Sequence, residues 1–170
     1  YKRQGKIVGG GLPVGVYGGK ASIMNNISPD GPVYQAGTLS GNPIAVSAGT
    51  ALLKQLKDKA LYEKLEANAY LFLTIIGEFC KKENIPFSYS ARGGMFGFFF
   101  SETPPKNFDD VCNSNIDMFS LFFKGMLEKN IYLPPSAYES CFISNQHDEN
   151  KIRRAAKTAI EVLKDIKDEV

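Results

Sequence analysis

The amino-acid sequence predicts, for residues 59–170, a small α+β layer in which helices lie on one face of a mostly antiparallel sheet. After residue 58 the order of hydrophobic patterns is helix, strand, strand, helix, strand, strand, helix. A second observation concerns residues 1–41, which hold ten of the 16 glycines of the chain. An ordinary domain does not usually begin with so glycine-rich and turn-rich a segment. The length of 170 residues therefore fits a piece of a larger protein.

Composition and charge exclude several classes of protein. With 44% hydrophobic and 22% charged residues the chain is ordinary globular material, and a net charge of +2 gives no strongly basic surface for nucleic acid. The sequence contains no apolar run long enough for a membrane helix and no signal peptide at its start. Cys80, Cys112 and Cys141 are far apart and odd in number, so we expect neither a disulfide framework nor a metal site. A cytoplasmic, reducing setting follows as the simplest expectation.

The glycine-rich first part contains two predicted helices. A short helix is expected over residues 20–27, before Pro29 and Pro32 break it. Asn42 and Pro43 then have the residue types of an N-cap and a first helical position, for a helix over Ile44–Leu56. Because that helix is apolar almost all round, we expect it to be buried.

The second part gives clearer periodicity. A helix is predicted from Asp58 to about Asn84, and residues 102–109 are predicted to form a polar loop. The remaining predicted elements are strands over Phe87–Ser90 and Met95–Ser101, a helix from Ile116 to about Lys129, strands over Ile131–Leu133 and Cys141–Ile143, and a final helix over Ile152–Val170.

Several familiar motifs fail on inspection. Gly19-Lys20 is followed by Ala21 rather than Ser or Thr, which excludes a Walker A loop, and the dinucleotide-binding glycine spacing is also absent. His147 is the single histidine, and its place in a loop before a helix favours a structural or capping role. The run Phe98–Phe100 lacks interleaved basic residues, so we expect it in a core or interface.

One segment that keeps a chemical interpretation surrounds Lys6. Lysine forms imines with carbonyl compounds once it has lost its proton, and partial desolvation lowers its pKa. The glycines at 9, 10 and 11 would let the backbone approach a flat ligand closely. The structural alternative is a surface lysine before a glycine turn.

A second such segment runs from Gly31 to Pro43. Gly37, Thr38 and Ser40 lead directly to the predicted helix start at Asn42. Free amides, a hydroxyl group and a helix dipole together suit a phosphate group. The structural alternative is ordinary helix capping.

Together these segments resemble the glutamate-1-semialdehyde 2,1-aminomutase family, within the class III, fold type I aminotransferases that use pyridoxal 5'-phosphate (PLP). GKIVGGGLPVGVYGG (residues 5–19) is similar to the family's Schiff-base lysine segment, and GPVYQAGTLSGNP (31–43) to its phosphate-contacting segment. Further on, GGMFGFFF (93–100), FFKGMLEKNIYLPPSAYES (122–140) and FISNQHDENKI (142–152) follow the family's C-terminal pattern. YQAGTLSGNP and YLPPSAYE resemble the aminomutase more than transaminases in general.

The resemblance implies a fold, a reaction and a set of roles. It implies an α/β, fold type I protein in which residues 1–58 end the large PLP-binding domain and residues 59–170 form the small C-terminal domain. The reaction implied is the conversion of glutamate 1-semialdehyde to 5-aminolevulinate, a tetrapyrrole (porphyrin) precursor, by a cytoplasmic homodimer with PLP/PMP. Lys6 would bind PLP and shuttle protons, Gly37 and Thr38 would bind its phosphate across the dimer interface, Tyr34 would line the site, and Glu139 would lie near the substrate entrance.

The sequence also departs from the family. Tyr1-Lys2-Arg3-Gln4 does not resemble the family's apolar run before the lysine, and the family's upstream half, with the aspartate that pairs with the cofactor ring, has no counterpart here. We therefore expect this chain alone to be inactive. Two alternatives remain open: another class III transaminase acting on an ω-amine, and a non-catalytic fragment that associates with a partner chain.

Overall fold

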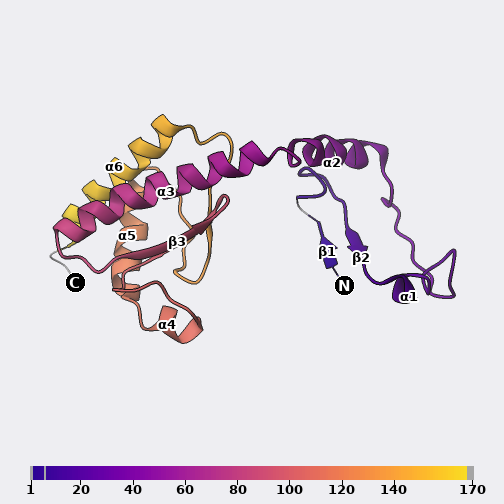
Figure 1. Ribbon diagram of the computed structural model, residues 1–170, viewed down its shortest axis with the longest axis horizontal. Helices are drawn as coiled ribbons and strands as arrows, with labels where there is room; N and C mark the ends of the chain where they lie inside the picture. The colour runs from indigo at the N-terminus through magenta and orange to yellow at the C-terminus, as the bar shows by residue number, and fades with distance from the viewer. Residues whose placement is uncertain (1, 6, 168–170) are drawn as a thin grey trace. The chain divides into compact units, whose positions relative to one another are not determined.

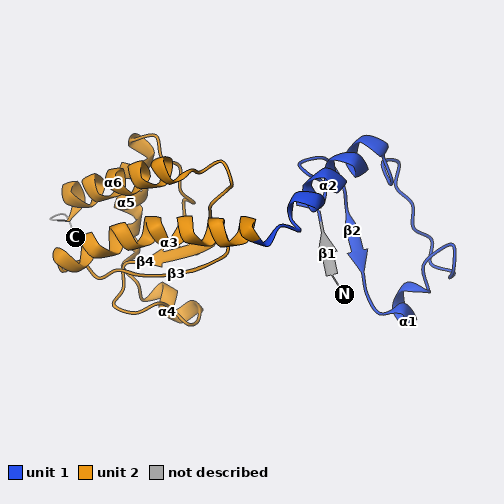
Figure 2. Ribbon diagram, turned by 45° about the horizontal axis from the view of Figure 1, so that its top comes forward, with its two compact units in different colours: residues 1–59 blue, residues 60–170 orange. Residues whose placement is uncertain are grey.

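The computed structural model describes residues 2–5 and 7–167. The chain divides into two compact units, residues 1–59 (unit 1) and residues 60–170 (unit 2), which Figure 2 colours separately.

Unit 1 opens with a two-stranded antiparallel ribbon that the sequence patterns did not predict. β1 (Lys2–Gln4) pairs with β2 (Val16–Gly18), with Arg3 opposite Tyr17. α1 (Ala21–Met24) is shorter than the helix expected over residues 20–27. The chain turns back after α1, where an isolated bridge joins Ile27 to Val33 and satisfies backbone groups that a longer helix would have used.

α2 (Pro43–Gln55) begins where the capping pattern predicted. The Asn42 side chain accepts hydrogen bonds from the amides of Ile44 (3.1 Å) and Ala45 (3.2 Å), as an N-cap does. The expectation that this helix is buried is wrong for this chain. Only Ala45 and Gly49 are buried in α2, whereas Ile44 is 72% exposed, because the described residues of unit 1 offer little to cover it.

Unit 2 is an α+β layer, as the order of patterns predicted (Figure 1). Its sheet has three antiparallel strands in the order β3-β4-β5, with Tyr89 opposite Phe98 and Met95 opposite Phe142. The elements are α3 (Lys59–Lys82), β3 (Ser88–Arg92), β4 (Met95–Phe99), α4 (Phe108–Cys112), α5 (Ile116–Glu128), β5 (Cys141–Phe142) and α6 (Glu149–Ile166).

Two local predictions in unit 2 fail. Residues 131–133 were expected to form a strand, but they follow the end of α5 as irregular chain: Asn130 has a left-handed φ of 62° and the Ile131 amide donates to the Met126 carbonyl. The two prolines that follow lack amide donors, so this segment does not extend the sheet. The short helix α4 lies where residues 102–109 were expected to end a loop, and Asn107 caps it.

The hydrophobic core lies entirely in unit 2. Phe98 is its aromatic centre, with ring centroids 5.6–6.3 Å from those of Phe87, Phe100, Phe119 and Phe122. This confirms the expectation that Phe98 and Phe100 are core residues. The apolar stripe predicted for the last helix is also buried, at Ile152, Ala156, Ala159, Leu163 and Ile166. Val170, the last residue of that predicted stripe, lies outside the described residues.

Candidate active site

The glycine segment of unit 1 is folded into tight turns. The Gly5 carbonyl accepts from the Gly9 amide at 2.9 Å, the Ile7 carbonyl from the Gly10 amide at 3.0 Å, and the Gly9 carbonyl from the Leu12 amide at 3.0 Å. Lys6, the predicted imine-forming residue, lies outside the described residues. The backbone on both sides of position 6 is therefore held by short-range hydrogen bonds.

The same segment packs closely on α2. Gly9 and Gly49 are both buried, and a Cβ atom on Gly49 would collide with the Val8 carbonyl oxygen. Gly10 has a left-handed φ of 58°, and its Cβ would lie 2.8 Å from the Ala48 carbonyl oxygen. Glycine is thus required at these positions by the approach of one backbone to another, in addition to any ligand.

The second predicted segment forms a bonded loop before α2. The Ser40 amide donates to the Gly37 carbonyl at 2.9 Å, and the Asn42 amide donates to the Leu39 carbonyl at 3.1 Å. Gly41 has a positive φ of 69°, which favours glycine at this turn. The loop leaves Gly37 and Thr38 exposed, next to the start of α2.

The start of α2 does not offer the free amides that were expected for a phosphate group. The amides in the first turn of α2 are not free, because Asn42 takes those of Ile44 and Ala45 with its side chain and that of Val46 with its carbonyl. Pro43 has no amide hydrogen to donate. Donors for an anion must then come from the loop itself, where the Thr38 hydroxyl has no hydrogen-bond partner within the described part of the chain.

The two segments meet at one pocket of unit 1. Its volume is about 610 Å³. The lining residues come from both segments and from α2: Pro13, Val14, Gly15, Tyr17, Gln35, Gly37, Leu39, Ser40, Gly41 and Val46. Motifs separated by some twenty residues in the sequence thus border a single cavity.

Tyr17 and Gln35 line this pocket, although the sequence did not single them out as site residues. The sequence did carry a signal for Tyr17, which is an aromatic residue set among glycines. In the structure its side chain is 44% exposed. Tyr34, which was expected to line the site, is 83% exposed and is not among the residues around this pocket.

Glu139 belongs to unit 2, in the turn that precedes β5. Its amide donates to the Ser136 carbonyl at 3.1 Å, and its side chain is exposed. The buried Ala137 anchors this turn. Among the predicted site residues that the structure describes, Gly37 lines the unit 1 pocket, whereas Thr38 lies next to it in the loop, and neither Tyr34 nor Glu139 lines that pocket.

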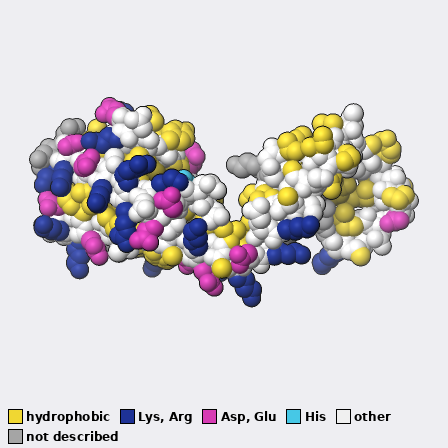
Figure 3. Space-filling view, turned by 90° about the horizontal axis from the view of Figure 1, so that it is seen from above, with side chains coloured by type: hydrophobic (Ala, Val, Ile, Leu, Met, Phe, Trp, Pro, Cys, Tyr) yellow, Lys and Arg dark blue, Asp and Glu magenta, His cyan; other side chains and the backbone are white. Residues whose placement is uncertain are grey.

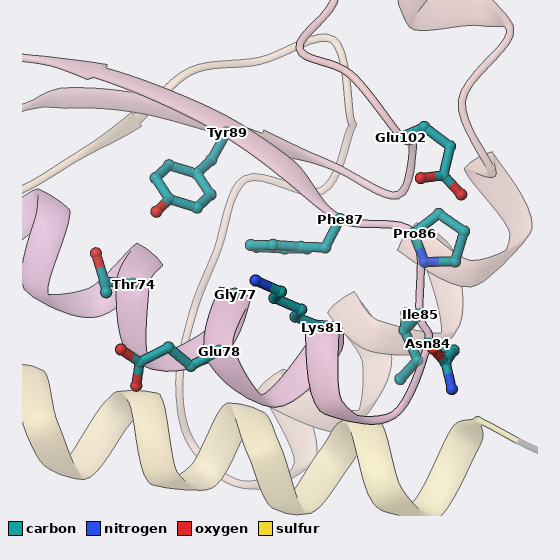
Figure 4. A pocket seen from close by; sticks show the side chains of 10 residues that line it. All are labelled: Thr74, Gly77, Glu78, Lys81, Asn84, Ile85, Pro86, Phe87, Tyr89 and Glu102. Carbon is teal, nitrogen blue, oxygen red and sulfur yellow. The ribbon is translucent and has the colours of Figure 1, made fainter.

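A second cavity, of about 510 Å³, lies in unit 2 at the end of α3 (Figure 4). Glu78, Lys81 and Glu102 are among its lining residues, beside the ring of Phe87. Figure 4 shows the Lys81 ammonium pointing toward that ring. Lys81 thus contributes a positive charge to the lining of this cavity, and none of the predicted site residues lines it.

The remaining reactive side chains have structural roles. His147 Nδ1 accepts from the Ser144 amide at 3.0 Å, and the His147 carbonyl accepts from Asn68 at 2.8 Å, which confirms its structural role before α6. Burial raises the pKa of Cys80 and that of Cys141 to about 12, so both thiols stay protonated. Among residues 2–5 and 7–167, no cluster of side chains suits a metal ion and no helix is long and apolar enough to span a membrane.

The family match and the fold together define the class of the protein. The chain belongs to the class-III aminotransferase family, which matches residues 3–136. Among curated proteins it is 44% identical over 162 residues to glutamate-1-semialdehyde 2,1-aminomutase 2 of Bacillus licheniformis. The aligned region covers 95% of this chain and 37% of that protein. The resemblance inferred from the sequence is thereby confirmed.

Solved structures show the same fold. An ω-transaminase from Sphaerobacter thermophilus superposes with a TM-score of 0.82 at 22% identity, over 97% of this chain and 38% of the other. A glutamate-1-semialdehyde aminomutase from Pseudomonas aeruginosa, in complex with PMP, superposes with a TM-score of 0.65 at 14% identity. That match covers 76% of this chain and 28% of the other. The expected fold type I α/β class is confirmed. The chain spans 37% of the length of the Bacillus licheniformis protein and 38% and 28% of the lengths of these two solved structures.

Proposed function

We propose that this chain is the C-terminal part of a PLP-dependent aminomutase that converts glutamate 1-semialdehyde to 5-aminolevulinate in tetrapyrrole biosynthesis. The observation that carries the proposal is the shared pocket of unit 1, which the lysine segment and the phosphate segment both border. The 44% identity to the Bacillus licheniformis aminomutase supports this reaction. In this proposal residues 1–58 end the large PLP-binding domain and residues 59–170 are the small domain.

The described residues fit the proposed cofactor. The pocket of about 610 Å³ has room for a ring and a phosphate group, and a Cβ on Gly37 would lie 2.8 Å from Ser40 Oγ and fill part of the loop. The exposed Thr38 hydroxyl is available to donate to an anion. Residues 1–59 contain only two carboxylate side chains, Asp30 and Asp58, so the local charge also favours a phosphate.

Each predicted residue has a role in this proposal. Lys6 binds PLP and moves a proton between substrate carbons, while the Gly37 backbone and the Thr38 hydroxyl hold the phosphate. Tyr34 borders the completed site, and the Glu139 carboxylate stands at the substrate entrance. When bound, PLP supplies the electron sink for the reaction, and the protein supplies orientation, proton transfer and charge.

The assembly proposed is a cytoplasmic homodimer in which each subunit contributes to its neighbour's phosphate site. Unit 1 supports a larger assembly because it exposes many large apolar side chains. Among the described residues of unit 1, six of these side chains are more than half exposed: Ile7, Ile23, Val33, Tyr34, Leu39 and Ile44. Such surface is usually covered in a complete protein.

The decisive experiment uses the complete protein loaded with PLP. Borohydride reduction should fix a pyridoxyl group on Lys6, found by mass spectrometry of a digest. Lys6→Ala should keep the fold and lose most of the turnover, because no other group replaces the lysine as nucleophile and base. A pyridoxyl label found only on another lysine would overturn the assignment.

A second candidate function has one observation in its favour, the TM-score of 0.82 to an ω-transaminase. At 22% identity that likeness concerns the fold alone. A substrate comparison separates the two functions: rapid amino transfer to 2-oxoglutarate without 5-aminolevulinate would favour the transaminase. A flat visible spectrum with added PLP, together with self-association, would instead favour a non-catalytic fragment that binds a partner chain.

A further inference from the structure

The residue before Glu139 is held by a neighbouring helix. The ring of Tyr138 packs on that of Phe108, the first residue of α4, with centroids 5.4 Å apart and planes inclined at 30°. The Tyr138 hydroxyl donates to Cys112 Sγ, at the end of the same helix, at 3.7 Å. Tyr138 therefore contacts both ends of α4.

The turn that carries Glu139 is fixed by short-range bonds as well. The Tyr138 amide donates to Ser136 Oγ at 3.2 Å, and the Glu139 amide donates to the Ser136 carbonyl at 3.1 Å. These bonds fix the backbone conformation within the turn. They do not fix how the turn is oriented relative to the rest of unit 2, which depends on its packing. Within the described residues, this turn packs on unit 2 through the buried Ala137 and through the contact of Tyr138 with α4.

α4 is itself fastened to the core of unit 2. Asn107 caps its start by accepting from the Asp110 amide at 2.9 Å. After its end, the buried Ser114 hydroxyl donates to the Val111 carbonyl at 2.7 Å, and the Asn115 amide donates to the Phe100 carbonyl at 3.0 Å. A continuous set of contacts thus runs from the end of β4 through α4 to the turn that carries Glu139.

The contact buries little surface. Phe108 is 69% exposed and Tyr138 is 51% exposed, so the ring pair adds much less to folding than a core contact does. The hydrogen bond to Cys112 raises the pKa of Tyr138, which keeps its hydroxyl protonated and able to donate. A contact that adds little stability but fixes a turn is well suited to orienting the residue next to it.

We propose that Tyr138 is a positioning residue, held by Phe108 and Cys112 of α4, that sets the direction of the Glu139 carboxylate in the reaction. The inference rests on the proposed function, in which Glu139 acts at the substrate entrance. Tyr138 acts through Glu139 and is not itself a catalytic residue. A small misplacement of a reacting group is enough to slow turnover markedly, so loosening the contact with α4 has a kinetic effect.

The test is a double-mutant cycle in the complete, PLP-loaded enzyme. Phe108→Ala removes the ring contact, Tyr138→Phe removes only the hydroxyl bond, and Glu139→Gln removes the carboxylate. We expect Phe108→Ala to lower kcat about tenfold with KM and the unfolding midpoint little changed, and Tyr138→Phe to lower it less. The conservative variant Phe108→Tyr keeps an aromatic ring at this position, so it should keep the wild-type kcat that Phe108→Ala loses.

The Glu139→Gln background and a matched tyrosine variant separate an effect through Glu139 from a general loss of contacts. In the Glu139→Gln background Phe108→Ala should cause no further loss, because the residue through which it acts is gone. Tyr70→Phe, which removes another exposed tyrosine bond (to the Ala91 carbonyl, 3.2 Å), should leave kcat unchanged.

Three results would overturn the inference, and they are distinguishable. If Phe108→Ala lowers kcat equally with and without Glu139, Tyr138 does not act through that carboxylate. If Glu139→Gln lowers kcat while both contact variants keep the wild-type rate, the proposed role of Glu139 stands and the positioning role fails. If Glu139→Gln itself keeps the wild-type kcat, the proposed role of Glu139 fails, and the positioning role with it.

Discussion

Gly10 shows most directly, at the scale of single residues, what the glycine segment does. Its φ of 58° is left-handed, and an added Cβ would lie 2.8 Å from the Ala48 carbonyl of α2. We expect Gly10→Ala in the complete protein to cost about 1–3 kcal/mol of stability and to weaken PLP binding, because the turn after Lys6 must shift. Thermal unfolding and a titration with PLP measure the two effects.

Gly15→Ala is the matched control for this prediction. Gly15 lines the same pocket, but its backbone is not left-handed and nothing in the described structure lies within 4 Å of a Cβ placed there. We expect near wild-type stability. Equal losses in the two variants would show that close packing on α2 is not what requires glycine at position 10.

The ion pair between Glu83 and Lys167 gives a pH-dependent prediction at the same scale. The Lys167 ammonium lies 2.8 Å from the Glu83 carboxylate and, through this hydrogen bond and its charge, lowers the pKa of Glu83 below the ordinary 4.5. A lowered pKa in the folded state adds stability above pH 4.5 that is lost as the pH falls through the folded value.

We therefore expect Glu83→Gln to reduce the fall in unfolding midpoint between about pH 5 and pH 3. Glu128→Gln is the control, since Glu128 forms no ion pair within the described residues. An acid transition in the Glu83→Gln variant as steep as in the wild type would contradict this explanation.

Among the elements, α5 and α6 show a contact that periodicity alone does not reveal. A Cβ on Gly125 of α5 would lie 2.5 Å from Cγ1 of Val162, which is 1% exposed in α6. The absence of a side chain at position 125 lets the two helices approach. Because Val162 is β-branched and enclosed, it has no free rotamer into which to move.

We expect Gly125→Ala to destabilise the protein by about 1–3 kcal/mol through overpacking, despite the higher helix propensity of alanine. Lys124→Ala, at the neighbouring exposed position, should change little. Adding Val162→Ala to Gly125→Ala should cost less than the two separate losses together, because each change relieves the other. Strict additivity in chemical denaturation would contradict this packing.

For the whole chain, the two units differ in how they are stabilised. The hydrophobic core is drawn from unit 2 alone, whereas unit 1 buries one of its hydrophobic side chains, Ala45, among the residues described. On the face seen in Figure 3, unit 2 displays many charged side chains and unit 1 displays mainly hydrophobic ones. We therefore expect unit 1 to depend on further protein surface for its stability.

This contrast predicts different behaviour of the two parts. Residues 60–170 expressed alone should unfold cooperatively and remain monomeric, because their core is complete. Residues 1–59 alone should unfold without a cooperative transition, or associate. Circular dichroism melts and sedimentation check both, and a cooperative monomeric transition of residues 1–59 would contradict the assignment of unit 1 to a larger domain.

Much of the fold was accessible from the sequence because the signals are local. Asn42 and Pro43 marked the start of α2, and the stripe from Ile152 to Ile166 marked the buried face of α6. The strand expected over 131–133 did not form, because the Ile131 amide donates to the Met126 carbonyl of α5. The ribbon of β1 and β2 was missed because glycine-rich segments carry little strand signal.

The sequence by itself determined the helices with strong periodicity, the family, and the segments expected to hold a lysine-bound cofactor and its phosphate. Only the tertiary structure decided that these segments border one pocket and that Tyr138 contacts α4. The physical reason is range. Capping and periodicity act within a few residues, whereas a cavity or a ring contact depends on groups that only folding brings together.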